Sequence, residues 1–242
     1  MSEITNLPDH VAIILDGNRR WARGQELQDE DGHRKGIETL VLIAKAAANF
    51  NIKYLTLYSF SKENWKRDPS EISNLMDLMN SFESEYLDEI ILNNIKVTVI
   101  GDMDTLAKPQ KRIIKMVQER THDNNGMQLI AAFNYSGRDE IIRAMKKILD
   151  DVQLSKISID MINDDLMGNY LDTANIPDPD LIIRTSGEMR LSNFLLWQCA
   201  YSEFVFTETY WPDFTVDQFQ NALEQYSQRE RRYGRNTPNK IV

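Results

Sequence analysis

One stretch of the chain decides its fold: Val11-Ala12-Ile13-Ile14-Leu15-Asp16-Gly17-Asn18-Arg19-Arg20-Trp21. It opens with an uninterrupted apolar run, the pattern of a parallel strand that is covered on both faces. The run gives way at once to a carboxylate, a glycine and two arginines. Because ligands of open parallel sheets bind beyond the carboxyl ends of the strands, we expect a binding site in this loop.

Five more short apolar runs follow, and they alternate with longer helical patterns. The predicted strands after Val11–Leu15 are Tyr54–Phe60, Val97–Ile100, Leu129–Phe133, Leu181–Ile183 and Phe204–Thr207. The predicted helices are Gly36–Phe50, Ser70–Asn93, Lys108–His122, Gly137–Val152, Ile159–Tyr170 and Val216–Arg232. This order predicts a single α/β domain over residues 1–242, with a mainly parallel six-stranded sheet and helices on both faces.

The composition limits the class of protein. With 242 residues, 42% of them hydrophobic, the chain can bury the core of one domain. Its single cysteine, Cys199, lies in an apolar run that predicts a core position, and it excludes an internal disulfide. Residues Met1–Asp9 show no signal-peptide pattern, and no run approaches the roughly 18 to 20 apolar residues of a membrane span. We therefore expect a protein that is cytoplasmic or peripheral to a membrane.

The distribution of charge points to a particular kind of ligand. The net charge of −9 argues against nucleic acid as a partner. The arginines nevertheless gather in three groups, which suggests small, concentrated anionic ligands. They are Arg19, Arg20, Arg23 and Arg34; Arg184 and Arg190; and Arg229, Arg231, Arg232 and Arg235. Solvated helix faces are the other interpretation, which stays open above all for the C-terminal group.

Four of the predicted strand ends carry arginine together with glycine, serine or asparagine. The loops are Asp16–Trp21, Ser61–Arg67, Asn134–Arg138 and Arg184–Ser192. Such loops offer backbone N–H groups and guanidinium groups to phosphate oxygens. Asp16 would repel phosphate unless Mg²⁺ lies between the two. The alternative is an ordinary tight turn, for which Asp-Gly-Asn is a common composition.

Other phosphate chemistries lack their motifs. The chain has no P-loop and no Gly-x-Gly-x-x-Gly fingerprint, its serines are not in a nucleophile elbow, and its histidines have no metal-ligand spacing. The helical pattern Ser70–Asn93 carries a wide apolar stripe that is rich in methionine. The stripe is either core packing or one wall of a slot for a flexible apolar ligand. A slot that leads to a phosphate-binding strand end would suit an amphiphilic diphosphate.

The order of the motifs resembles that of the cis-prenyltransferase family, of the undecaprenyl diphosphate synthase kind. The matching segments are His10–Ala22, Tyr58–Arg67, Asp180–Gln198, Glu203, Trp211–Phe214 and Arg229–Gly234. They span about residues 10–234 and leave 1–9 and 235–242 as tails. The resemblance implies an apolar tunnel, a homodimer, and Mg²⁺-dependent condensation of isopentenyl diphosphate with an allylic diphosphate, usually farnesyl diphosphate. The implied product is a long cis-polyprenyl diphosphate, such as undecaprenyl diphosphate for the cell-wall lipid carrier, released in transient contact with a membrane.

The resemblance also implies roles for individual residues. Asp16 would hold Mg²⁺ against a diphosphate, with Glu203 as the second ligand, and Asn64 would position the proton transfer. Arg232 and Gly234 would reach the site of the partner chain. The allylic diphosphate would meet Gly17, Asn18, Arg19, Arg20, Trp21 and His33; the reacting end would meet Ser61, Lys62, Glu63, Trp65 and Arg67; and the isopentenyl diphosphate would meet Arg184, Arg190, Leu191 and Ser192.

Two positions depart from the family pattern. Asp29 stands where the family usually has arginine, and it should weaken diphosphate binding unless Arg23 or Arg34 substitutes. Met189 stands where a histidine sometimes occurs, so no metal role falls there. His33 also has a purely structural interpretation. Two other functions stay open: a phosphatase or kinase, which the missing nucleophile and P-loop disfavour, and an inactive paralogue acting as a binding or regulatory subunit, which Asp29 alone supports.

Overall fold

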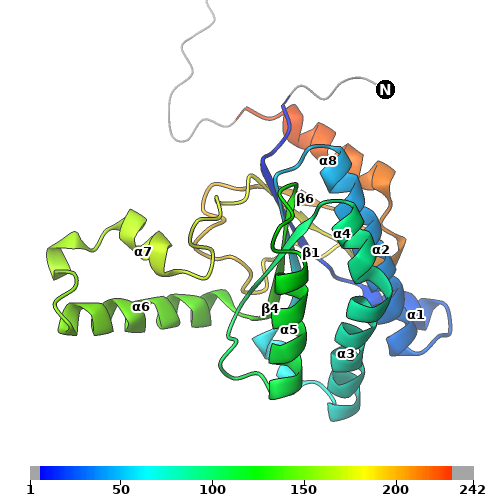
Figure 1. The fold of residues 1–242 in the computed structure, drawn as a ribbon. Helices are drawn as coiled ribbons and strands as arrows, with labels where there is room; N and C mark the ends of the chain where they lie inside the picture. The colour runs from blue at the N-terminus through cyan, green and yellow to red at the C-terminus, as the bar shows by residue number, and fades with distance from the viewer. Residues whose placement is uncertain (1–5, 231–242) are drawn as a thin grey trace, which may run out of the picture.

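The structure, a computed structural model, describes residues 6–230 and is built on one parallel sheet (Figure 1). Its six strands lie in the order β3-β4-β2-β1-β5-β6, and every neighbouring pair is parallel. The strands are β1 (His10–Ile14), β2 (Tyr54–Ser61), β3 (Lys96–Ile100), β4 (Gln128–Tyr135), β5 (Leu181–Arg184) and β6 (Glu203–Phe206). The predicted α/β class and all six predicted strands are confirmed, with ends that shift by at most two residues.

The register of the strands decides which loops share an edge of the sheet. Ile14 at the end of β1 pairs with Tyr58 of β2 on one side and with Arg184 of β5 on the other. Arg184 in turn lies opposite Phe206, the last residue of β6. The loop that contains Asp16 therefore lies at the same edge as the carboxyl ends of β2 and β5, which is where the sequence predicts a site.

Helices follow the strands in the predicted alternation, with one addition. The helices are α1 (Asn18–Gly24), α2 (Asp29–Asn49), α3 (Pro69–Ser81), α4 (Leu87–Leu92), α5 (Lys108–Arg120), α6 (Gly137–Gln153), α7 (Asp164–Tyr170) and α8 (Val216–Ser227); the short turns are η1 (Lys62–Lys66), η2 (Phe82–Tyr86), η3 (Ile159–Met161) and η4 (Trp211–Asp213). The addition is α1, whose seven residues are too few to show a helical period. α2 begins at Asp29 and not at Gly36, because acidic side chains favour a first helical turn and Asp31 accepts a hydrogen bond from the Gln28 N–H at 3.1 Å.

Four predicted helices are interrupted or shorter than expected. α5 ends at Arg120, two residues before the predicted His122. The pattern Ser70–Asn93 contains α3 and α4, which the π-helical turn η2 separates. Within Ile159–Tyr170, the side chain of Asn163 caps α7 and so divides that helix from the 3₁₀ turn η3. α8 ends at Ser227, and the predicted end, Arg232, lies outside the described residues. None of the helices within residues 6–230 combines the length and the apolar composition that crossing a bilayer requires.

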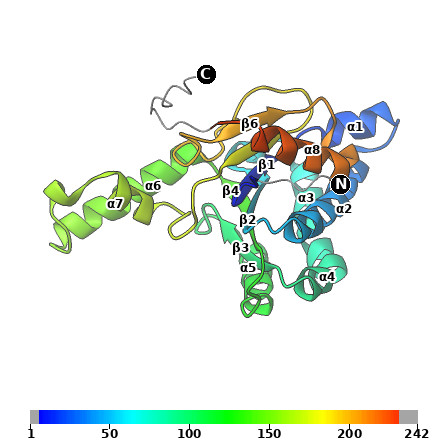
Figure 2. The same cartoon turned by 90° about the horizontal axis from the view of Figure 1, so that it is seen from above.

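Side chains that alternate along the strands build two core layers. The layer that faces α2, α4, α5 and α8 contains Val11, Ile13, Leu55, Leu57, Val97, Leu129, Leu181 and Ile183. The opposite layer packs against the irregular segment that carries Phe194, Leu195 and Cys199, which confirms the core position of that cysteine. α6 and α7 extend sideways from the sheet and share a small core of their own (Figure 2). α2, α4, α5 and α8 thus lie on one side of the sheet, and the site opens on that side.

α1 is held close to α2 through glycine. A Cβ on Gly32 would lie 2.2 Å from the carbonyl oxygen of Asn18, and one on Gly36 would lie 2.5 Å from the Oδ1 of the same residue. Asn18 follows directly after Gly17, so this packing fixes the loop that carries Asp16.

Replacing Gly32 by alanine should therefore lower the free energy of unfolding by roughly 1–3 kcal/mol, because the new methyl group overpacks the helix contact. Gly24→Ala is the matched control in α1, since its Cβ would meet nothing within 4 Å. We expect this control to be neutral or to stabilise by up to about 1 kcal/mol. Urea unfolding measures both variants, and equal stabilities would contradict the close helix contact.

Candidate active site

Asp16 lies just past β1 and is held by two arginines. Its Oδ2 lies 2.8 Å from Nη2 of Arg184, and its Oδ1 lies 3.2 Å from Nη2 of Arg20. The Thr185 hydroxyl fixes the backbone, because it accepts from the Asp16 N–H at 2.9 Å and donates to the Asp16 carbonyl at 2.7 Å. Burial raises the pKa of Asp16, but the contacts with Arg184 and Arg20 together outweigh burial, so the pKa lies below its ordinary value. The carboxylate is therefore charged.

Gly17 lets the chain turn tightly beneath Tyr210. Its φ is 109°, and a Cβ there would come within 2.7 Å of the Tyr210 ring. The following turn places the Arg20 guanidinium 5.5 Å from the centre of the same ring. Arg20 also donates to Ser186 Oγ at 2.5 Å and pairs with Glu188 at 3.1 Å. Residues of the loops after β1, β5 and β6 thus all contact this guanidinium.

Arg184 is a buried cation that faces the cavity. The residue is only 3% exposed. Besides Asp16, its guanidinium meets Ser192 Oγ at 2.8 Å and the carbonyl oxygen of Arg190. Its Nε is buried and has no hydrogen-bond partner within the described part of the chain. The Arg190 side chain, in contrast, points to the rim, where it is 59% exposed and pairs with Glu188.

A cavity of about 670 Å³ opens beside these groups and runs between the sheet and the helices. This volume is within the usual range of ligand sites, roughly 300–1,000 Å³. Charged and polar side chains surround its mouth, whereas its depth is lined by Leu40, Leu57, Leu75, Leu78, Met79, Phe82, Val97, Ile113, Val117 and Leu129. Part of the methionine-bearing stripe lines the cavity, and other members, such as Leu87 and Ile90, belong to the core. The stripe therefore packs in the core at some positions and lines the cavity at others.

Glu71 of α3 lies close to two arginines and a histidine at the mouth of the cavity. Its carboxylate lies 2.9 Å from Arg67 Nη1, 3.3 Å from Arg19 Nη1 and 3.7 Å from His33 Nε2. Burial, and then the charge of Arg67, lowers the pKa of His33, so this imidazole is neutral at pH 7. Glu71 therefore ties α1 and Arg67, the residue after η1, to α3 around the opening.

Asp29 occupies the first turn of α2 and binds two arginines. Its carboxylate accepts from Arg19 Nε at 2.7 Å and from Arg23 Nη2 at 2.9 Å. The hydrogen bond from Arg23 is the main cause that lowers the pKa of Asp29, with Arg19 adding to it. Arg34 lies elsewhere, 3.5 Å from Glu30. Asp29 therefore competes with any anionic ligand for the charge of Arg19 and Arg23.

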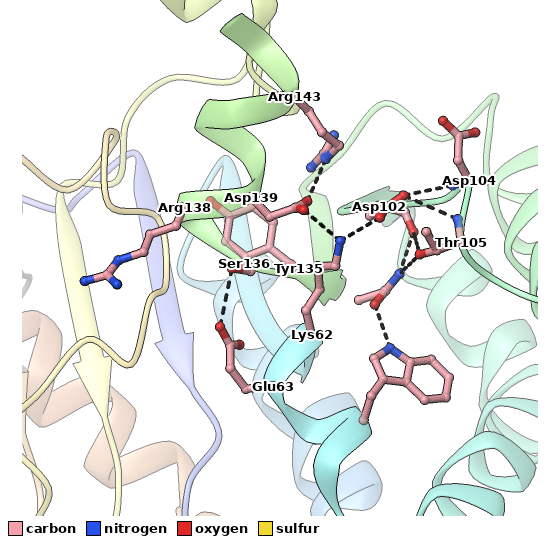
Figure 3. A network of polar contacts seen from close by, with 12 residues as sticks. Lys62, Glu63, Asp102, Asp104, Thr105, Tyr135, Ser136, Arg138, Asp139 and Arg143 are labelled. Atoms are coloured by element: carbon pink, nitrogen blue, oxygen red, sulfur yellow. Dashed lines mark hydrogen bonds and ion pairs between the residues drawn. The ribbon is translucent and has the colours of Figure 1, made fainter. Parts of the chain in front are cut away.

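The predicted site residues divide into two groups. The cavity is lined by Asp16, Gly17, Asn18, Arg19, Arg20, His33, Ser61, Asn64, Arg67, Arg184 and Ser192. The cavity wall formed by residues 6–230 does not include Trp21, Lys62, Glu63, Trp65, Arg190 or Leu191. Lys62 instead lies between Asp102 and Asp139, as Figure 3 shows. The last two predicted residues, Arg232 and Gly234, lie outside the described residues.

Glu203 lies at the other end of the sheet from Asp16. It is the first residue of β6 and pairs in register with Leu181, the first residue of β5. From strand spacing and rise, the Cα atoms of Glu203 and Asp16 are on the order of 15–20 Å apart. The Glu203 carboxylate pairs with Arg229 at 2.9 Å. One chain therefore does not bring the two predicted metal ligands together.

Several residues at the mouth are not among the predicted site residues. Glu71 stands four residues after Arg67, a spacing that brings the two side chains together and could have indicated the pair. Ser186 and Glu188 belong to the quoted motif after β5, but sequence alone does not tell which of its side chains turn inward. Tyr210 gives no signal, because it reaches Gly17 only through the fold.

The described part of the site offers a metal ion one carboxylate, that of Asp16, so a ligand must supply further oxygens. Within residues 6–230 no group of three or more His, Cys, Asp or Glu side chains could hold a metal by itself. Asp16 is the only carboxylate among the described residues that line the cavity. Mg²⁺ commonly binds one or two carboxylates together with substrate phosphates. The donor set thus fits Mg²⁺ that is shared between Asp16 and a phosphate ligand.

Comparison with known proteins bears on this arrangement. The model of a prenyltransferase family described as "Putative undecaprenyl diphosphate synthase" matches residues 14–234. The isoprenyl transferase of Clostridium perfringens is 48% identical over 94% of this chain and 90% of that protein. That of Agrobacterium fabrum is 47% identical over 95% of this chain and 93% of that protein.

Two solved structures share the fold over 96% of this chain and all of their own length. One is lavandulyl diphosphate synthase from Lavandula x intermedia in complex with dimethylallyl diphosphate, with a TM-score of 0.91 and 35% identity. The other is "a probable undecaprenyl diphosphate synthase" from Campylobacter jejuni, with a TM-score of 0.79 and 33% identity.

The competition at Asp29 leads to a prediction. Asp29→Asn should bind inorganic pyrophosphate about three- to tenfold more tightly than the unaltered chain, because Arg19 and Arg23 lose their competing carboxylate. Isothermal titration calorimetry measures the change. Glu30→Gln is the matched control in the same helical turn and should leave the affinity unchanged, since Glu30 pairs with Arg34. Unchanged affinity in Asp29→Asn would contradict the competition.

Proposed function

Because the chain belongs to the undecaprenyl diphosphate synthase family of prenyltransferases, we propose that it condenses isopentenyl diphosphate with an allylic diphosphate to give a long-chain cis-polyprenyl diphosphate. One observation carries the proposal: the Asp16–Arg184 pair stands at the mouth of an apolar cavity of about 670 Å³. A cationic mouth suits a diphosphate, and an apolar depth suits a hydrocarbon tail. Farnesyl diphosphate is the proposed starter and undecaprenyl diphosphate the proposed product.

The two diphosphates would divide the mouth between them. Arg19 and Arg20 both line the cavity, so they would bind the allylic diphosphate and stabilise the charge that grows on it as it leaves. Arg184 and Ser192 are joined at 2.8 Å on the β5 side and would bind the isopentenyl diphosphate. Asn64 lines the cavity, and its Oδ1 accepts from the Ser61 N–H at 3.0 Å. A neutral amide is a poor base, so its proposed role is positioning, with the released diphosphate as the proton acceptor.

Mg²⁺ is the proposed cofactor. Asp16 would hold it together with substrate phosphate oxygens, and the ion would neutralise negative charge on the leaving diphosphate. Glu203 does not join Asp16 within one chain, so the proposal for the metal rests on Asp16.

The proposed product also bears on where the protein works. A long polyprenyl chain is too apolar to remain in water, so we propose release in transient contact with a membrane by a protein that otherwise stays in the cytoplasm. Supply of a lipid carrier for cell-wall glycans is the proposed role. The competing function, an inactive regulatory paralogue, draws its support from Asp29, which occupies Arg19 and Arg23.

Incorporation of radiolabelled isopentenyl diphosphate tests the reaction. With farnesyl diphosphate and Mg²⁺, the unaltered chain should form label that butanol extracts. Asp16→Asn should reduce the rate by about 10²-fold or more, because the charge that faces the leaving diphosphate is lost. Asp123→Asn, an exposed carboxylate beyond α5, should keep the full rate. No incorporation by the unaltered chain would contradict the proposed reaction and favour the regulatory alternative.

We also propose that the chain works as a homodimer. α6 presents Ile142, Met145 and Leu149, which are 50%, 49% and 55% exposed and lie on one face at helical spacing. Leu154, Ile159 and Met161 are also exposed and belong to the segment that joins α6 to α7. These two helices form the projecting arm in Figure 2. Large exposed apolar patches mark interaction sites, and a second copy would cover the same surface with its own.

Leu149→Arg should therefore convert the dimer into a monomer, as measured by light scattering after gel filtration. Leu92→Arg is the control, because Leu92 is 85% exposed but lies on α4, away from the arm. A monomeric unaltered chain, or a dimer that survives the arginine in α6, would contradict the α6 interface.

A further inference from the structure

The 3₁₀ turn η1 has three faces, and only one of them lines the cavity. A 3₁₀ helix has three residues per turn, so side chains three positions apart lie on the same face. Asn64 in the turn and the two residues that flank it, Ser61 and Arg67, follow this spacing, and all three line the cavity. Lys62 and Trp65 share the second face, and Glu63 lies on the third.

Lys62 anchors the second face through two carboxylates. Its Nζ lies 2.7 Å from Asp102 in the β3–α5 loop and 2.7 Å from Asp139 at the start of α6 (Figure 3). Asp102 is buried, and its Oδ1 accepts from the backbone N–H of Asp104 at 3.2 Å. Asp139 also accepts from Arg143 at 2.8 Å. The ammonium group therefore joins three separate elements at one point.

Trp65, the next residue on this face, contacts Asn134, a neighbour of Asp102. Its indole N–H donates to Asn134 Oδ1 at 2.8 Å. The amide nitrogen of Asn134 donates to the carbonyl oxygen of Asp102 at 2.6 Å and to Thr105 Oγ1 at 3.0 Å. The Trp65 ring also packs edge-on against Phe60 at 5.1 Å. Lys62 and Trp65 are thus both connected to Asp102, Lys62 directly and Trp65 through Asn134.

Glu63 ties the third face to the loop after β5. Its Oε1 accepts from Asn193 Nδ2 at 2.7 Å, and Ser136 Oγ lies 3.4 Å away. Asn193 follows directly after Ser192, whose hydroxyl meets Arg184. Glu63 therefore connects η1 with the side of the mouth proposed for the isopentenyl diphosphate.

We propose that Lys62, Glu63 and Trp65 are positioning residues, which hold η1 from outside so that Asn64 and Arg67 face the reacting groups. Lys62, clamped between Asp102 and Asp139, is the central one. A short 3₁₀ turn has poor hydrogen-bond geometry of its own, so its shape depends on what it is fastened to. A shift of about 1 Å in a catalytic group can cost about 10²-fold in rate. This inference rests on the proposed condensation reaction.

A direct contact between Lys62 and a substrate diphosphate is the competing role, and it makes the opposite prediction for Asp139. If Lys62 bound substrate, Asp139 would compete for its charge, and Asp139→Asn would leave the rate unchanged or improve substrate binding. If Lys62 is a clamp, Asp139→Asn damages the reaction although Asp139 lies outside the cavity wall that residues 6–230 form.

Steady-state kinetics of Lys62→Gln, Asp139→Asn and the double variant test the clamp. We expect kcat to fall roughly ten- to a hundredfold in each single variant, with KM for isopentenyl diphosphate within about threefold. The double variant should be no worse than the worse single variant, because both break one unit. Lys62→Arg should recover at least about half of the rate, since it keeps the charge. The matched control is Lys53→Gln, which breaks a lysine–aspartate pair of 3.0 Å with Asp9 at the amino ends of β1 and β2, the edge of the sheet opposite the site, and should leave kcat unchanged.

Amide hydrogen exchange of the segment 61–68 gives a readout that does not need activity. Exchange should be faster in Lys62→Gln and in Asp139→Asn than in the unaltered chain or in Lys53→Gln. If Lys62→Gln does not fold, Asp139→Asn and Lys62→Arg still test the clamp.

A raised KM in Lys62→Gln together with unimpaired kinetics and unchanged exchange in Asp139→Asn would overturn the clamp. An inactive unaltered chain with the expected exchange pattern would overturn the condensation reaction and leave the clamp standing.

Discussion

The ion pair between Asp16 and the buried guanidinium of Arg184 is the contact on which the rest of the site depends. Arg184 is 3% exposed, so the loss of Asp16 would leave a buried positive charge uncompensated. The pair can form only if the loops after β1 and β5 lie at the same edge of the sheet. The parallel register of β1 and β5 places them there. Thr185 adds hydrogen bonds to the Asp16 backbone and fixes the same junction. The polar mouth and the apolar depth of the cavity follow from this meeting point.

The mouth keeps its cations paired with carboxylates of the chain itself. Arg19 is shared by Asp29 and Glu71, and Arg20 is shared by Asp16 and Glu188. An incoming diphosphate must replace some of these partners, so its affinity is the difference between two sets of ion pairs. This accounts for an acidic protein with net charge −9 that still concentrates arginine at one edge of its sheet. Within this balance, Asp29 adds a negative charge beside Arg19 and Arg23.

Continuous apolar runs predict the sheet well, because strands buried on both faces need little else. The convergence of Asp16 with Arg184 is also predictable, since both follow strands of one parallel sheet. α1 is too short for a period, and the π-helical turn η2 leaves no mark in the apolar stripe. The position of Glu203 could have been foreseen, because it precedes the predicted strand and so belongs to its amino end.

The motif after β2 shows where a sequence motif stops being informative. It brings together residues such as Asn64, which faces the cavity, and Lys62, which faces Asp102. The two side chains point in different directions because η1 is a 3₁₀ turn with three residues per turn. Five residues are too few to reveal this period from the sequence. Membership of a motif therefore does not distinguish a substrate contact from a support for one.

A crystal structure with a farnesyl diphosphate analogue whose leaving oxygen is replaced by sulfur tests the central claim most directly. The account predicts a diphosphate within hydrogen-bond reach of Arg19 and Arg20, beside Asp16, and a hydrocarbon tail that runs past Leu78 towards Val117. A tail outside this cavity, or a diphosphate bound away from the Asp16–Arg184 pair, would contradict it.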